Sequence, residues 1–87
     1  MKKIHYENNK NVISETLRAK RLALRVTQGE LAARMQTLGC QIDQQMISKI
    51  EHNTRFVTDY ELVLLAKALK ITPDELLCDF LRSLGEK

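Results

Sequence analysis

Apolar residues recur along most of the chain at spacings of three and four, the pattern of helices that bury one side. The clearest groups are Leu31, Met35 and Leu38; Leu62, Leu65, Ala66 and Leu69; and Leu76, Leu77, Phe80, Leu81 and Leu84. Ile13, Leu17 and Leu24 indicate one more helix, over about residues 12–25, whose other side is basic. No stretch alternates with the period of two that a strand would show. The pattern therefore predicts an all-α protein.

Three of the expected helices begin with the same motif, Thr-x-x-Glu, at residues 27–30, 58–61 and 72–75. In this capping box the threonine hydroxyl accepts a hydrogen bond from the third backbone N–H of the helix, and the glutamate accepts one from the threonine N–H. Pro73 takes the first helical position of the third helix, where its missing N–H costs nothing. We therefore expect helices to start at these three points.

Another short helix is predicted over about residues 44–52, with Asp43 as its N-cap. Ile47 and Ile50 supply its inward side. At about 100° per residue, the polar positions then lie on the outward side. These positions are Gln44, Gln45, Ser48 and Lys49. The complete prediction is a compact protein of five helices with brief connections.

The length of 87 residues suits one small domain, which we place at residues 12–87. Residues 1–11 lack a helical period and are expected to form an N-terminal arm or tail. Lys2, Lys3 and Lys10 either follow a DNA groove, as homeodomain arms do, or stay solvated. No apolar run approaches the roughly 18 residues of a membrane span, and no signal peptide is apparent. A cytoplasmic protein without membrane contact is therefore expected.

Charge is distributed unevenly along the chain. Residues 1–58 contain ten Lys or Arg and five Asp or Glu, a net +5, whereas residues 59–87 contain four and six, a net −2. A polyanion would therefore dock on the N-terminal part of the protein. Chance asymmetry in a small protein is the alternative explanation.

The sequence has no signature of a metal, a cofactor or catalysis. Cys40 and Cys78 form no Cys-x-x-Cys pair, and His5 and His52 lack metal-ligand spacing to them. We expect two reduced cysteines, with Cys78 in the core because its surroundings are apolar. The sequence also lacks paired carboxylates, an activated nucleophile and a phosphate-binding glycine loop, so no enzyme activity is expected.

The outward side of the 44–52 helix carries side-chain amides and little negative charge. A glutamine can pair with adenine through two hydrogen bonds in the major groove, and a lysine can reach guanine or a phosphate. A merely solvated helix would more often carry Glu/Lys pairs, although that interpretation stays open. The preceding helix offers its N-terminus to a phosphate, and together the two helices have the arrangement of a helix-turn-helix.

Four segments taken together resemble the phage repressor and Cro-type helix-turn-helix proteins, also called the XRE or lambda-repressor-like family. They are "LRAKRLALRVTQ", "TQGELAARM", "MISKIEHNTR" and "TDYELVLLAKALKITPDELL", within a likeness that extends over about residues 12–84. It implies a compact five-helix lambda-repressor-like domain that binds double-stranded operator DNA, usually as a dimer. The inserted stretch "QTLGCQID" departs from the family pattern. We therefore expect a lengthened turn between helices 2 and 3, with Gly39 left-handed after a longer second helix.

The resemblance assigns roles to individual residues by position. Those that face bases are Gln44, Gln45, Ser48 and Lys49. Those beside DNA phosphates are Gln28, Asn53, Thr54 and Arg55. Apart from the resemblance, we also expect Thr27 and His52 beside phosphates. His52 would suit a phosphate as a cation at the end of its helix, and a passive exposed histidine is the alternative. Arg21 and Glu51 match a structural ion pair that joins the first and third helices in many relatives.

The sequence thus predicts a sequence-specific DNA-binding transcription regulator, more specifically a repressor, with the helix at about residues 44–52 in the major groove. The alternative is a protein-binding adaptor or antitoxin-like module of the same fold that does not read DNA sequence. A homodimer is expected at least on DNA, through surplus apolar residues of the last helix. These are Leu77, Phe80, Leu81 and Leu84. A regulatory protein remains a further candidate partner.

Overall fold

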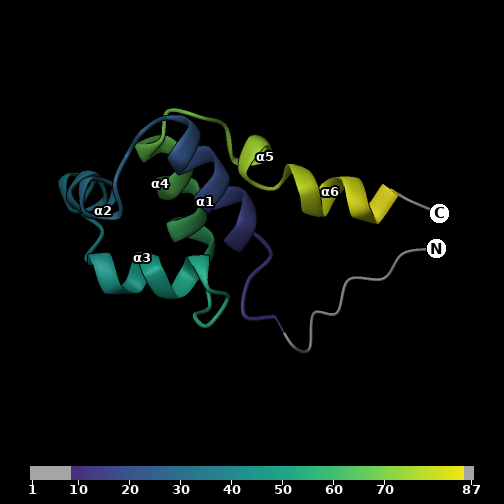
Figure 1. Cartoon of the computed structure of the whole chain (residues 1–87), viewed down its shortest axis with the longest axis horizontal. Coiled ribbons are helices and arrows are strands. Elements are labelled where there is room, and N and C mark those ends of the chain that lie inside the picture. The colour runs from purple at the N-terminus through teal and green to yellow at the C-terminus, as the bar shows by residue number, and fades with distance from the viewer. Residues whose placement is uncertain (1–8, 86–87) are drawn as a thin grey trace.

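The computed structural model describes residues 9–85, and these residues form helices joined by short connections (Figure 1). The helices are α1 (Ser14–Ala23), α2 (Gln28–Thr37), α3 (Gln44–Glu51), α4 (Asp59–Ala68), α5 (Pro73–Leu76) and α6 (Cys78–Gly85). No strand occurs within residues 9–85, so the all-α prediction is confirmed. Most of the predicted arm, including Lys2 and Lys3, lies outside the described residues.

The predicted helix starts are confirmed in atomic detail. Capping boxes with both hydrogen bonds are present at Thr27–Glu30, Thr58–Glu61 and Thr72–Glu75. Asp43 caps α3, because its side chain accepts a hydrogen bond of 2.8 Å from the Met46 N–H. These side chains satisfy backbone donors that the first turn of a helix otherwise leaves without acceptors.

Four of the helices end in the same way, with a residue at positive φ just after the helix. These residues are Arg25 (φ 59°), Gly39 (φ 88°), Asn53 (φ 61°) and Lys70 (φ 59°). In each case this residue donates to the carbonyl three positions earlier, and the next residue donates to the carbonyl five positions earlier. This is the Schellman motif, which satisfies carbonyls at the helix end. The prediction for Gly39 is confirmed.

The core lies between α1, α2, α3, α4 and α5. Its largest fully buried side chains are Ile13, Leu17, Leu31, Met35, Ile42, Ile47, Ile50, Leu65, Leu69 and Leu76. Ile47 and Ile50 form the inward side of α3, as its sequence pattern predicts. Ile42 is buried beneath the lengthened connection between α2 and α3. The buried isoleucines therefore fix α3 against the other helices of the core.

The predicted fifth helix is divided into α5 and α6 by a turn at Leu77. Leu76 and the Thr72 capping box fix α5 on the core, whereas no residue of α6 is buried. α6 therefore projects from the other helices (Figure 1). The prediction that Cys78 belongs to the core is wrong, because it is half-buried at the start of this projecting helix. Cys40 is the buried cysteine, and both thiols are free.

A substitution at Lys70 tests whether the residue after α4 adopts the left-handed conformation. A left-handed conformation disfavours residues with a Cβ atom, and Lys70 is exposed at φ 59°. Lys70→Gly should therefore raise the free energy of unfolding by about 0.5–1 kcal/mol, measured by urea titration. Lys67→Gly, inside α4, should lower it by about 1 kcal/mol. A loss of stability in both variants would contradict the left-handed conformation of Lys70.

Candidate nucleic-acid interface

α3 lies along one side of the molecule, at the bottom of Figure 1, and its outward side is open to solvent. Gln44, Gln45 and Lys49 are exposed, whereas Ser48 is half-buried. The first turn of α3 contains no acidic residue, and Lys49 lies in its last turn. The structure thus brings the four predicted base-reading residues onto one helix and leaves three of them accessible.

A buried ion pair holds the C-terminal end of α3. Nε of Arg21 lies 2.6 Å from Oε2 of Glu51, and Nη2 of Arg21 lies 2.9 Å from Oε1. The side chains are 8% and 1% exposed, and the hydrogen bond to Glu51 raises the pKa of Arg21. Arg21 also donates to the carbonyl of Val26 at 2.9 Å. The predicted contact is therefore present, and it fixes α3 against α1.

Gln28 connects α2 to the same carboxylate. Its Nε2 donates to Oε1 of Glu51 at 3.1 Å, so helices α1, α2 and α3 meet at one side chain. This contact was not foreseen from the sequence, where Gln28 was expected only beside a phosphate. The amide has a second hydrogen, which leaves it able to donate outward as well.

The N-terminus of α2 adjoins the first residue of α3. The capping box uses the N–H groups of Thr27 and Glu30, while those of Gln28 and Gly29 find no acceptor within residues 9–85. A Cβ atom built on Gly29 would lie 3.4 Å from Oε1 of Gln44. Two free backbone donors and an exposed amide thus lie side by side. Such a helix terminus carries partial positive charge, which favours an anion.

The loop after α3 is largely engaged in internal contacts. Thr54 donates from Oγ1 to the carbonyl of Lys49 at 3.1 Å, and Nδ1 of His52 lies 2.7 Å from the carbonyl of Ser48. The side chain of Asn53 binds the backbone of the N-terminal segment. The exposed edges of His52 and Thr54 stay accessible, but these side chains also have structural partners.

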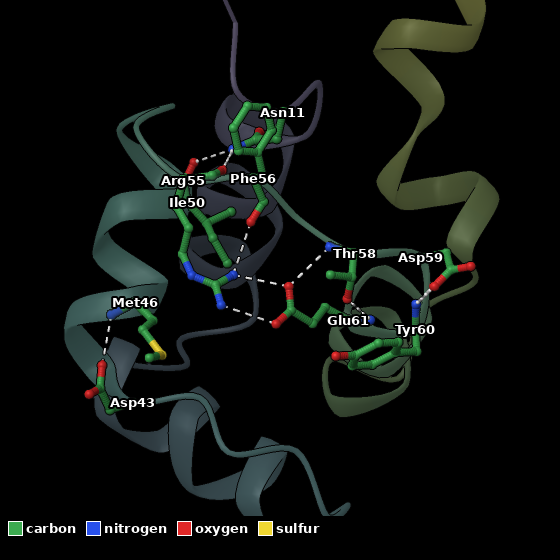
Figure 2. Close-up of polar contacts among 10 residues, drawn as sticks. All are labelled: Asn11, Asp43, Met46, Ile50, Arg55, Phe56, Thr58, Asp59, Tyr60 and Glu61. Atoms are coloured by element: carbon green, nitrogen blue, oxygen red, sulfur yellow. Dashed lines mark hydrogen bonds and ion pairs between the residues drawn. The ribbon is translucent and has the colours of Figure 1, made fainter.

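Arg55, predicted beside a phosphate, is turned toward α4 (Figure 2). Its Nη1 and Nη2 lie 3.0 and 3.1 Å from the two carboxylate oxygens of Glu61, and Nη1 also donates to the carbonyl of Phe56. Glu61 is the capping glutamate of α4 and accepts from the Thr58 N–H as well. Arg55 therefore fixes the loop to α4, a role that its sequence position did not reveal.

The described residues show no arrangement for holding a metal ion or spanning a bilayer. No group of three or more His, Cys, Asp or Glu within residues 9–85 is arranged to hold a metal ion. None of the helices in this part of the chain combines the length and apolarity needed to span a bilayer.

Comparison with known families agrees with this geometry. A helix-turn-helix family model matches residues 17–76, from within α1 to the end of α5. The chain therefore belongs to the helix-turn-helix family of the XRE or lambda-repressor-like type. Membership indicates a DNA-binding transcription regulator, in a family that is not typically enzymatic. A search of curated proteins finds no match to the chain.

The Arg55–Glu61 ion pair should make the free energy of unfolding depend on pH in the acidic range. The hydrogen bond from Arg55 lowers the pKa of Glu61 below its ordinary value of 4.5. The contribution of the ionised Glu61 to the free energy of unfolding is therefore fully present above pH 4.5. It is lost as the pH falls through the lowered pKa of the folded protein. Glu61→Gln should cost about 2 kcal/mol at pH 7 and much less at about pH 2, measured by urea titration.

The matched control for this prediction is Glu30→Gln. Glu30 closes the capping box of α2 in the same way but is exposed and forms no ion pair within residues 9–85; Arg34 affects its pKa only as a minor cause, after the hydrogen bonds with Thr27. Its substitution should cause a clearly smaller loss at pH 7. Equal losses at pH 7 and pH 2 for Glu61→Gln would show that the ion pair contributes nothing.

Proposed function

We propose that this regulator recognises a specific DNA sequence by placing α3 in the major groove, and that it acts as a repressor. The observation that carries the proposal is the outward side of α3, where Gln44, Gln45 and Lys49 are exposed. Repression is the simplest consequence, because an operator that is already occupied is closed to other proteins.

Base reading follows from the chemistry of these side chains. Gln44 and Gln45 occupy the first turn of α3, the end that reaches deepest into the groove in helix-turn-helix proteins. A glutamine amide can donate to N7 and accept from N6 of adenine at the same time, and this pair of hydrogen bonds distinguishes adenine from the other bases. Lys49, one helical turn later, reaches guanine or a phosphate, and Ser48 offers a half-buried hydroxyl.

Phosphate binding is supported by the N-terminus of α2. The free N–H groups of Gln28 and Gly29 favour an anion, and Gly29 has no side chain to keep a phosphate away. Thr27 and the second hydrogen of the Gln28 amide border the same position. Because this end of α2 adjoins Gln44, a phosphate held there would set the register of α3 on the bases.

Substituting the amides tests base reading. Bound duplexes are first selected from a random pool, and affinities are then measured on the selected site and on random DNA. Gln44→Ala or Gln45→Ala should lose about 1–3 kcal/mol on the selected site and much less on random DNA. Gln41→Ala, an exposed glutamine before α3, is the matched control and should change neither affinity.

Two results would contradict base reading by α3. Equal losses on selected and random DNA would mean that the amides do not discriminate bases. Weak parent binding with no selected consensus would favour the protein-binding adaptor or antitoxin-like module instead.

We also propose that two copies bind the operator together, through α6. Leu81 and Leu84 are 46% and 54% exposed, and no residue of α6 is buried in the described structure. An isolated helix of eight residues is marginal in water, so a covering partner would stabilise it. A second copy fits, because a two-fold axis would pair the two apolar sides and place two α3 helices on one duplex.

The double variant Leu81→Gln and Leu84→Gln should bind the selected duplex about tenfold more weakly and as one copy. Arg82→Gln, on the same exposed helix, is the control. Sedimentation of the complexes reports the number of copies bound. For the parent we expect two copies and an inverted repeat with half-sites about 34 Å apart. A parent that binds as one copy would rule out the dimer.

A further inference from the structure

The side chain of Asn53 joins the end of α3 to the N-terminal segment. Its Oδ1 accepts hydrogen bonds from the N–H groups of Lys10 (2.8 Å) and Asn11 (3.0 Å), which lie 43 and 42 positions away in the sequence. Its Nδ2 donates to Oδ1 of Asn9. Asn53 can bind in this way because its left-handed backbone ends α3 and leads the chain away from the helix.

Asn11 completes the contact from the other side. Its Nδ2 donates to the carbonyls of Ile50 (3.1 Å) and Arg55 (3.0 Å), so it bridges the end of α3 and the following loop (Figure 2). Its Oδ1 accepts from the N–H of Ile13, where α1 begins without a cap of its own. We call Asn9, Asn11 and Asn53 the asparagine joint.

The asparagine joint determines where Lys10 lies. The backbone of Lys10 is bound directly by Asn53, and its ammonium lies 4.9 Å from the ring centre of Phe56. Phe56 is itself 67% exposed on the loop after α3. Lys10 is exposed and forms no ion pair with any carboxylate of residues 9–85. Its charge is thus held at the surface, with no acidic partner among residues 9–85.

This position lies on the side of the molecule that α3 offers to DNA. In Figure 1 the start of the described chain lies beside the connection between α3 and α4, at the same side as α3. The loop residues expected beside phosphates, Asn53 and Arg55, have their side chains bound internally. Lys10 is a cation that the fold brings to the same edge.

We propose that Lys10, held by the asparagine joint, binds a phosphate of the DNA backbone that flanks the bases read by α3. This inference rests on the proposed function. Fixing the backbone of Lys10 before binding lowers the entropy lost when its side chain meets the phosphate. The asparagine joint thus makes the N-terminal segment a part of the DNA-binding surface and couples it to the recognition helix.

The first test measures affinity for the selected duplex against salt concentration, with the full chain. Each neutralised phosphate contributes about 0.9 to the slope of log K against log salt. Lys10→Gln should make the slope shallower by about that amount. Lys70→Gln is the control, because the connection between α4 and α5 lies at the top of Figure 1, on the side away from α3. An unchanged slope for Lys10→Gln would overturn the inference.

The second test separates the asparagine joint from the end of α3. Asn53→Gly keeps a residue that readily adopts the left-handed conformation but removes the hydrogen bonds to residues 9–11. Asn53→Gly should weaken binding to the selected duplex. In that background Lys10→Gln should cause a clearly smaller further loss of binding free energy than it does in the parent, because the effects of residues that act together are not additive. Thermal melting verifies that the variants are folded.

The outcomes are distinguishable from one another. Fully additive losses for Asn53→Gly and Lys10→Gln would show that the asparagine joint does not present Lys10, and would overturn the coupling. A parent that selects no DNA sequence would instead refute the proposed function. A parent that selects a site, with equal slopes for Lys10→Gln and Lys70→Gln, would refute this inference alone.

Discussion

The hydrogen bonds of the Glu51 carboxylate are the interaction on which the placement of α3 depends. The carboxylate accepts hydrogen bonds from Arg21 of α1 and Gln28 of α2, with its side chain 1% exposed. Losing one partner of such a pair leaves a buried charge and costs about 3–5 kcal/mol, although the intact pair adds little net stability. Its contribution is therefore chiefly to position: the last residue of α3 is fixed relative to both neighbouring helices.

The rest of α3 is held by its caps and by packing against the core. Eight residues are too few for a stable isolated helix, so packing and caps must hold it. Asp43 binds its first turn, Ile47 and Ile50 fill the core beneath it, and Asn53 ends it in the left-handed conformation. Each of these contacts lies on the inward side or at an end. The outward side is thus oriented by the fold without taking part in it.

Sequence patterns predicted what is local and missed most of what is distant; the Arg21–Glu51 pair, which joins α1 to α3, was foreseen only through the family resemblance. The capping boxes and Gly39 were foreseen because both are short patterns with one backbone geometry. The left-handed Lys70 was not, since its conformation serves to bring Ile71 back onto the core and the residue itself carries no signal. Pairings such as Arg55 with Glu61, or Asn11 with the end of α3, join separate elements and leave no periodic trace. The break at Leu77 lies where contact with the core ends: Leu77 still packs partly against the core, whereas no residue of α6 is buried.

These findings divide the surface around α3 into two kinds of residue. Gln44, Gln45 and Lys49 are exposed and form no buried contact, so substitutions there should leave the fold intact. Under the proposed function they would change the base sequence that is bound. Asn53 and Arg55, close by in the loop, are bound to other parts of the chain, so changing them alters the fold first. A helix-turn-helix built in this way can acquire a new operator preference through its outward residues alone, because the residues that aim α3 are separate from those that would read bases.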